Sequence, residues 1–166
     1  LSFRVSSQIR SSLIVDTHNH LWDIHTSDLY WLTPELLELG GPLVRDYSIE
    51  DMGVAFATVG VDRSILVQAW HDPDENDRWL EMADRTKLIG GVVSYIDLQS
   101  SGVGKLLDRF SQRTKFRGIR ACGQDVAEDD WLRRRDVRSA IRELALRGKY
   151  SLDLLLSIPQ LKDVPR

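Results

Sequence analysis

Two histidines separated by one residue stand directly after a short apolar run near the start of the chain. Residues 13–15 lead into Asp16, and His18 and His20 follow. In an extended segment residues i and i+2 point to one face, so both imidazoles are expected on the same side. Histidine is the commonest metal ligand and titrates near neutral pH, so the pair predicts a metal site or two donors to one substrate. Two polar histidines in a loop after a strand are the alternative interpretation.

A second group of candidate residues stands in strands later in the chain. Arg120 is expected to share a face with Gly118, which leaves room for a guanidinium that binds a carboxylate bidentately. A salt bridge inside the sheet is the alternative for this arginine. Asp153 lies in an apolar strand, where an acid is costly unless it is paired. It is expected to pair with Arg120 across the neighbouring strand or to contact substrate, whereas Arg117 is expected on the outside.

Three further residues are candidates for substrate binding. Gln68 ends a predicted strand and either hydrogen-bonds substrate or fills a packed layer. Gln124 follows the strand that carries Arg120. Trp31 lies in the loop after the histidines and, with Trp22, Tyr30 and Trp70, forms either a pocket wall or ordinary core.

Strands and helices are expected to alternate along the chain. Short apolar or β-branched runs predict strands, and apolar residues at helical spacing predict helices. The expected strands cover residues 13–17, 63–68, 88–96, 116–120 and 150–156. The expected helices cover residues 50–59, 74–85, 103–110 and 136–147, with a stub at 158–164. This order predicts a parallel sheet with outer helices, either an open doubly wound sheet or a (β/α)8 barrel.

Turn and cap residues support these boundaries. Pro34 and the Gly-Gly-Pro run at 40–42 predict an irregular loop. Ser48 with Asp51 three residues on is typical of a capped helix start, and Gly60 is typical of a helix end.

Composition excludes several classes of partner. The chain has 25 acidic and 22 basic residues, a net charge of -3, so nothing steers it to nucleic acid or to a membrane. Cys122 is the single cysteine, which excludes an internal disulfide and indicates a reducing, cytoplasmic compartment. Residues 1–12 contain two arginines, five serines and no acid. This segment is expected to be a disordered or cut tail, and a mitochondrial transit remnant is the alternative.

The run from Asp16 to Asp23 resembles the opening of the amidohydrolase-related TIM-barrel family, in particular its branch of sugar-acid lactonases and 2-pyrone-4,6-dicarboxylate lactonase. Other motifs follow in the order that this branch uses. They are Tyr30-Trp31-Leu32-Thr33-Pro34-Glu35, Asp62 with Leu66-Val67-Gln68-Ala69, Gly91-Val92-Val93 with Asp97, Arg117-Gly118-Ile119-Arg120, Gln124-Asp125, Asp130-Trp131-Leu132 and Asp153-Leu154-Leu155. The resemblance covers roughly residues 13–165.

The resemblance implies a lactone-opening hydrolase. His18 and His20 are then catalytic and polarise the lactone carbonyl, directly or through a divalent metal such as zinc or manganese. Arg120 holds the acidic or hydroxylated part of a small lactone or carboxylic acid substrate. A metal-dependent decarboxylase of the same fold and a non-catalytic truncated paralogue are the alternatives.

The chain departs from this family in length. A TIM barrel needs eight strands and about 250 residues, and this chain supplies five strands. The family's later histidine and its late aspartate, the proton acceptor, are therefore not encoded here. We expect an α/β fold, an incomplete (β/α)8 barrel in which residues 13–166 are the N-terminal part and the C-terminal strands are absent. Such a fragment is expected to be nearly inactive and to self-associate through open barrel edges.

Overall fold

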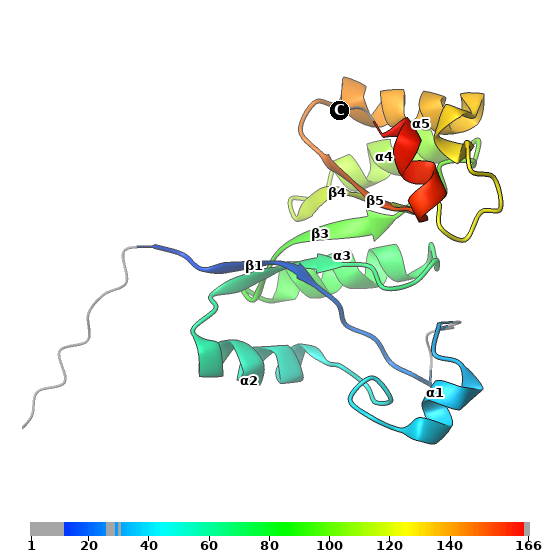
Figure 1. Cartoon of the computed structure of the whole chain (residues 1–166). Coiled ribbons are helices and arrows are strands. Elements are labelled where there is room, and N and C mark those ends of the chain that lie inside the picture. Colours follow the sequence, from blue (N-terminus) through cyan, green and yellow to red (C-terminus); the bar gives the residue numbers. More distant parts are fainter. Residues whose placement is uncertain (1–11, 26–28, 30, 165–166) are drawn as a thin grey trace, which may run out of the picture.

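A computed structural model of the chain describes residues 12–25, 29 and 31–164. Most of the expected N-terminal tail, residues 1–11, lies outside the described residues, and so does Tyr30. Five parallel strands pair in the order in which they occur in the chain (Figure 1). They are β1 (Val15–Asn19), β2 (Arg63–Val67), β3 (Ile89–Tyr95), β4 (Phe116–Cys122) and β5 (Ser151–Leu155). A doubly wound sheet reverses its strand order, so the sequential order confirms the incomplete barrel.

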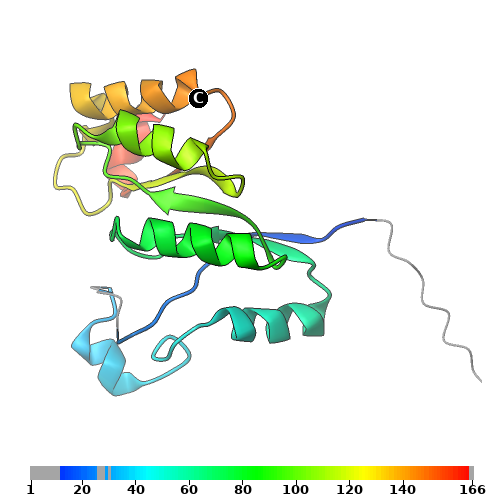
Figure 2. The same cartoon turned by 180° about the vertical axis from the view of Figure 1, so that it is seen from behind.

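The described helices are α1 (Pro34–Leu39), α2 (Ile49–Val59), α3 (Glu75–Arg85), α4 (Val103–Ser111) and α5 (Arg135–Leu146), with short 3₁₀ turns η1 (Trp131–Arg133) and η2 (Ile158–Asp163). Helices α2, α3, α4 and α5 cover one side of the curved sheet, whereas α1 lies away from it and has no buried residue. Figure 2 shows α3 and α4 in front of the strands, whereas in Figure 1 the same helices lie behind them. Over the residues that the structure describes, no helix has the length and apolar character needed to cross a membrane.

Local sequence explains where α2 begins and ends. The Ser48 side chain accepts a hydrogen bond from the Asp51 amide while the Asp51 carboxylate accepts one from the Ser48 amide, a complete capping box. Gly60 ends the helix with φ 74°, a left-handed conformation that glycine adopts without a Cβ clash. The predicted cap and helix end are therefore confirmed.

The loop predicted around Pro34 is wrong in one part, because Pro34 begins α1. Thr33 caps this helix by accepting a hydrogen bond from the Leu36 amide. Proline fits the first helical position, where its missing N–H would have no partner within the helix.

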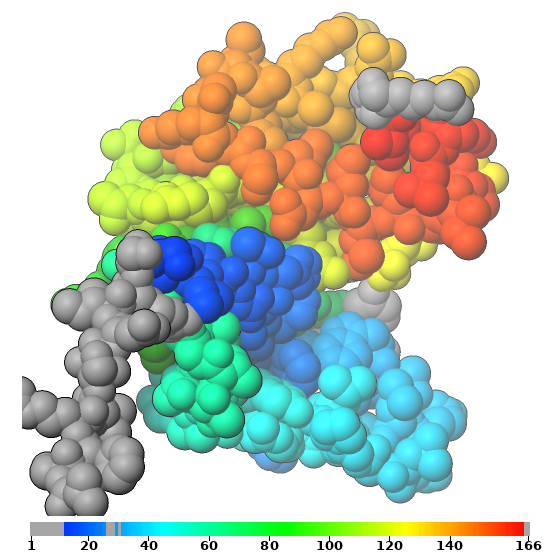
Figure 3. Space-filling model, turned by 60° about the vertical axis from the view of Figure 1, so that its left-hand side comes forward, coloured from blue at the N-terminus to red at the C-terminus, as the bar shows by residue number. Residues whose placement is uncertain are grey.

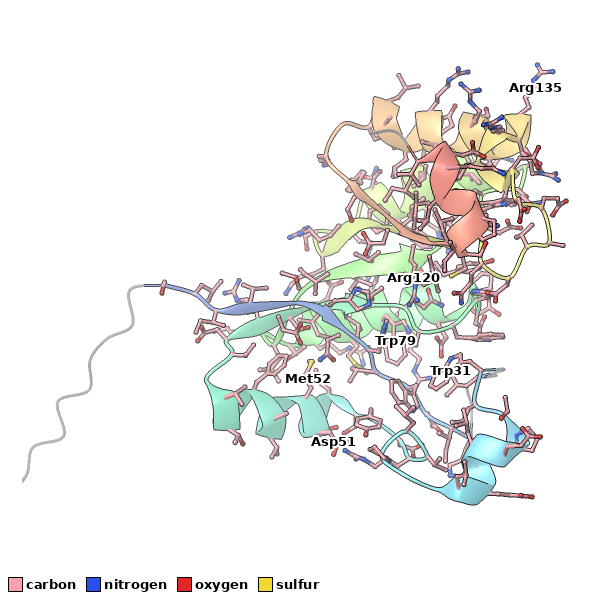
Figure 4. All side chains as sticks on the ribbon, viewed as in Figure 1. Trp31, Asp51, Met52, Trp79, Arg120 and Arg135 are labelled. Carbon is pink, nitrogen blue, oxygen red and sulfur yellow. The ribbon has the colours of Figure 1, made fainter. Side chains whose placement is uncertain are left out.

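The hydrophobic core lies between the sheet and its helices. Leu80, Ile89, Leu107, Phe110 and Ile119 are fully buried there. Figure 4 shows Met52 and Trp79 between the sheet and α2, and both belong to this core. The opposite side of the sheet would face the interior of a complete barrel. It is only partly covered here, and Arg120 on β4 and Tyr95 on β3 are therefore half-exposed.

Arg117 is exposed to solvent, as predicted, but its strand is irregular at this point. A register shift between β3 and β4 separates the pair of Val92 and Phe116 from the pair of Val93 and Gly118. Arg117 consequently lies over Gly91, where a Cβ would clash with its Cγ atom. The register shift therefore interrupts the strict alternation of side chains at Arg117.

Candidate active site

The end of β1 turns both histidines toward each other. Asp16 accepts hydrogen bonds from the His18 amide (3.1 Å) and from the Asn19 side chain (3.0 Å). The register between β1 and β2 shifts at this point, between Asp16 and Asn19. The Nε2 atoms of His18 and His20 lie 3.1 Å apart, with the rings edge to face. The two imidazoles therefore share one side of the chain, as their spacing predicts.

The backbone of β2 sets the tautomer of His20. Its Nδ1 atom lies 2.7 Å from the Val67 carbonyl oxygen, which can only accept, so Nδ1 carries the proton. Burial lowers the pKa of His20, and the positive charge of Arg120 and the neighbouring His18 lower it further, against the hydrogen bond to Val67. In this neutral form Nε2 has a lone pair directed at His18, which suits a metal ion or a hydrogen-bond donor.

Arg120 reaches from β4 across β3 to the end of β2. Its Nη1 atom donates to the Gln68 carbonyl oxygen at 2.9 Å. This bond holds the guanidinium near the strand ends, where Figure 4 shows it. The arginine therefore lies on the same rim of the sheet as His20.

Gln68 is fully engaged with the backbone around it. Its side-chain oxygen accepts from the Tyr95 amide at 2.8 Å, and its side-chain nitrogen donates to the Asp72 carbonyl oxygen. The residue is 1% exposed. This geometry favours positioning of the strand ends over the substrate contact expected for Gln68.

Asp153 lies opposite Arg120 in the register of β4 and β5. Within the described part of the chain the two side chains form no ion pair. The predicted pairing of Arg120 with Asp153 is therefore wrong, because Arg120 turns toward β2 instead. Asp153 is half-exposed on the edge strand, where water solvates its carboxylate.

Gln124 and Trp31 occupy opposite ends of this rim. The amide of Gln124 donates to the Leu155 carbonyl oxygen at 3.0 Å, and its side chain is exposed. Trp31 packs edge to face on Trp22, with ring centres 5.5 Å apart. Figure 4 shows Trp31 between the strand ends and α1. The Trp31 side chain is half-buried, which fits both a pocket wall and the margin of the core.

A second polar cluster, formed around His71, lies on this rim and was not predicted from the sequence. His71 stacks on Tyr95 (4.8 Å between ring centres) and lies 3.5 Å from the Asp125 carboxylate. Burial lowers the pKa of His71, and Asp125 opposes this shift. Burial raises the pKa of Tyr95 to about 12, so its phenol stays protonated at neutral pH. His71 and Asp125 each follow the carboxyl end of a strand, and this position in the sequence could have predicted that they lie on the rim.

The histidine pair fits two positions of a metal shell. Ligand nitrogens about 2.0–2.1 Å from a tetrahedral zinc lie about 3.3 Å apart, close to the 3.1 Å found between His18 and His20. A catalytic zinc usually has three protein ligands. Among the residues that the structure describes, no group of three or more histidine, cysteine or acidic side chains could hold a metal ion.

These features define one class of protein: part of a (β/α) barrel with paired histidines after its first strand. Comparisons with known proteins agree. The chain is 33% identical over 118 residues to an L-fucono-1,5-lactonase from Burkholderia ambifaria, a match covering 71% of this chain and 39% of that protein. It is 30% identical over 166 residues to the uncharacterized protein y4mH of Sinorhizobium fredii, which covers 90% of this chain and 56% of the relative. No family model matches the chain.

Solved structures show the same architecture. An amidohydrolase from Burkholderia multivorans with bound HEPES superposes with a TM-score of 0.79 at 27% identity, over 92% of this chain and 52% of that one. A second structure of an amidohydrolase from Burkholderia multivorans, with bound zinc, superposes with a TM-score of 0.78 at 28% identity. A probable 2-pyrone-4,6-dicarboxylic acid hydrolase from Acinetobacter baumannii, 13% identical, shares the fold with a TM-score of 0.60.

The chain is similar over most of its length to an amidohydrolase-related lactonase and to amidohydrolase structures. It spans 39% and 56% of the length of the two curated relatives, about half of a complete family member.

Proposed function

We propose that this chain supplies the first half of the active site of a lactone-opening hydrolase. The observation that carries the proposal is the arrangement of His18, His20 and Arg120, which β1 and β4 bring to one rim. The imidazole nitrogens lie 3.1 Å apart, and the guanidinium is anchored to the end of β2. The similarity to an L-fucono-1,5-lactonase supports this reaction type.

In the proposed reaction His18 and His20 act on the lactone carbonyl. A hydrogen-bond donor or cation at the carbonyl oxygen stabilises the negative charge that develops there when water attacks. Because Nδ1 of the neutral His20 donates to the Val67 carbonyl, its Nε2 atom offers a lone pair, which would hold a cation at this place rather than donate to the lactone oxygen itself. The acyl C–O bond of the ring then breaks, and the released alcohol oxygen takes a proton.

His18 and His20 would also be the residues that hold a divalent metal, with zinc or manganese as the proposed ion. A bound divalent ion would supply Lewis-acid polarisation of the carbonyl or a lowered pKa of bound water. The zinc in a similar amidohydrolase structure supports a metal in this family.

Arg120 is the proposed substrate-binding residue for a carboxylate or hydroxyl group of a small lactone or carboxylic acid. Arg120 bonds to the Gln68 carbonyl oxygen and to the Cys122 thiol, and the other N–H groups of its five remain for a ligand. Gln124, Asp153 and Trp31 would line the same rim. We also expect residues 13–166 to be the N-terminal part of a barrel. Self-association through the open edges of the sheet is a further prediction.

The test compares two proteins: the 166-residue chain and the longest reading frame that encodes it. The assay is opening of sugar-acid lactones, followed with a pH indicator. We expect the longer protein to be faster by at least about 10²–10⁴-fold, the contribution of a general base. In that protein His18→Ala, His20→Ala and Arg120→Ala should each reduce turnover or substrate binding, whereas exposed His25→Ala should not. Turnover by the 166-residue chain that survives His20→Ala would exclude the assigned site.

A further inference from the structure

A hollow lies at the amino ends of β4 and β5, at the edge of the sheet opposite to the rim that carries His20. It has a volume of about 410 Å³. Its walls are the segment that precedes β4 and the segment that precedes β5, which Figure 1 and Figure 2 show next to each other. Figure 3 turns this edge forward and shows the yellow-green segment before β4 beside the orange segment before β5. The proposed function uses the carboxyl ends of the strands, so it does not account for this hollow.

The lining of the hollow is basic and rich in hydrogen-bond donors. Arg113, Arg117 and Lys149 line it together with the hydroxyl-bearing side chains of Thr114 and Tyr150. Among the described residues that form the lining there is no carboxylate. A hollow with this composition favours an anion as its ligand.

Two of the three cations in the hollow lack a counter-charge. Arg113 bonds to the Asp84 carboxylate at 2.7 Å, so its charge is compensated. Over the part of the chain that the structure describes, Arg117 and Lys149 form no ion pair. The Nζ atom of Lys149 stands over the ring of Tyr150, 5.3 Å from its centre. Two positive charges therefore remain for a ligand.

Backbone contacts fix the position of the Arg117 guanidinium. Its Nη1 atom donates to the carbonyl oxygens of Thr114 (2.7 Å) and Phe116 (3.0 Å). The side chain lies over Gly91, where a Cβ would clash with it. Its other N–H groups make no hydrogen bond to the described residues. A planar fork held in this way is preorganised for an oxyanion.

Further positive charge lies beside Arg117. Lys115 donates to the Ile89 carbonyl oxygen at 2.5 Å, a neutral acceptor that leaves its charge uncompensated. Burial lowers the pKa of Lys115, and the positive charges of Arg63 and Arg117 lower it further, against the attraction of Asp84. The amino ends of β2 and β4 therefore contribute a positive potential that attracts anions to this edge.

We propose that this hollow binds a phosphate group, either as inorganic phosphate or as the monoester of a small molecule. Arg117 and Lys149 would contact its oxygens, and the hydroxyl groups of Thr114 and Tyr150 would donate to it. A phosphate group carries about −1.5 to −2 charges at neutral pH, which match the two uncompensated cations. The net charge of -3 for the whole chain disfavours a long polyanion, so the proposed ligand is small.

The test titrates the intact 166-residue chain with inorganic phosphate and with glycerol 3-phosphate by isothermal titration calorimetry. Sodium chloride keeps the ionic strength constant, and acetate is the control anion with a single charge. We expect a phosphate compound to bind at least about tenfold tighter than acetate, because it offers more charge and a third acceptor oxygen. Tighter binding of glycerol 3-phosphate would assign a monoester, and tighter binding of inorganic phosphate would assign the free ion.

Substitutions test the assigned contacts. Arg117→Gln and Lys149→Gln should each weaken phosphate binding by about tenfold, because each removes a charged donor. Arg117→Lys keeps the charge and loses the planar fork, so its effect should be smaller. Lys105→Gln is the matched control, since Lys105 is exposed on α4 and does not line the hollow. Lys149 is exposed as well, so Lys149→Gln tests the proposal even if Arg117→Gln does not fold.

Two outcomes would overturn the proposal. One is binding that acetate matches, or that Lys105→Gln weakens as much as the two substitutions in the hollow do, because either result would indicate unspecific attraction to a basic surface. The other is the absence of both binding heat and a rise in melting temperature with millimolar concentrations of either phosphate compound. Neither outcome bears on the proposed lactone reaction, because the assay contains no lactone and the two sites lie at opposite ends of the strands.

Discussion

His20 and Arg120 bond to consecutive carbonyl oxygens at the end of β2. His20 donates from Nδ1 to Val67 at 2.7 Å, and Arg120 donates from Nη1 to Gln68 at 2.9 Å. The backbone at residues 67–68 therefore holds a side chain that follows β1 and a side chain from β4. A change in the end of β2 is expected to move both groups together.

The first prediction concerns Gln68, which holds this piece of backbone. Gln68→Leu removes an acceptor for the Tyr95 amide and a donor to the Asp72 carbonyl, and both partners remain in the fold. We expect a loss of about 1–3 kcal/mol in the free energy of unfolding, the cost of buried unpaired polar groups. Urea unfolding measures it. Gln124→Leu is the control, since that side chain is exposed; an equal loss there would contradict the argument.

The second prediction concerns metal binding by the histidine pair. Isothermal titration with zinc should show binding by the unmodified chain, which His18→Ala or His20→Ala weakens by more than about tenfold, because even partners outside the ligand set contribute that much. Exposed His25→Ala is the matched control. Equal affinity in all four proteins would show that zinc binds elsewhere.

The third prediction concerns pH. Burial lowers the pKa of both His20 and His71, so the unfolded chain binds protons at these residues more readily than the folded chain. Their contribution to stability is present above the ordinary histidine pKa of about 6.5 and is lost as the pH falls through the lowered folded values. The melting temperature should therefore fall from about pH 7.5 to about pH 5. The double change His20→Gln, His71→Gln should make this fall shallower, whereas an unchanged slope would contradict the assignment.

The fourth prediction contrasts two glycines. A Cβ at Gly118 would clash with the Ser151 backbone across β4 and β5, so Gly118→Ala should destabilise the chain by about 1–3 kcal/mol. A Cβ at Gly104 in α4 would lie 3.8 Å from the Glu143 carboxylate, an ordinary contact. Gly104→Ala should therefore be neutral or stabilise by up to about 1 kcal/mol through helix propensity. Thermal unfolding of the two variants measures this difference. A lower melting temperature for Gly104→Ala than for Gly118→Ala would contradict the prediction.

Sequence alone determined the features that depend on neighbours in the chain. The spacing of His18 and His20 predicts their shared side because strand geometry repeats every two residues. Ser48 and Asp51 predict the start of α2 because a capping box involves only four residues. The alternation of apolar runs predicts the parallel strands, since each run must bury its side chains against a sheet.

Tertiary structure decided the features that depend on distant segments. Arg120 turns to the Gln68 carbonyl rather than to Asp153, a choice between two partners that are both far away in sequence. Arg117 lies over Gly91 because a register shift with β3 interrupts the alternation. His71 and Asp125 meet only because parallel strands bring their following loops to one rim. The residue types limit which hydrogen bonds and ion pairs are possible. The packed backbone determines which of them form, because it sets the distances between segments that are far apart in the sequence.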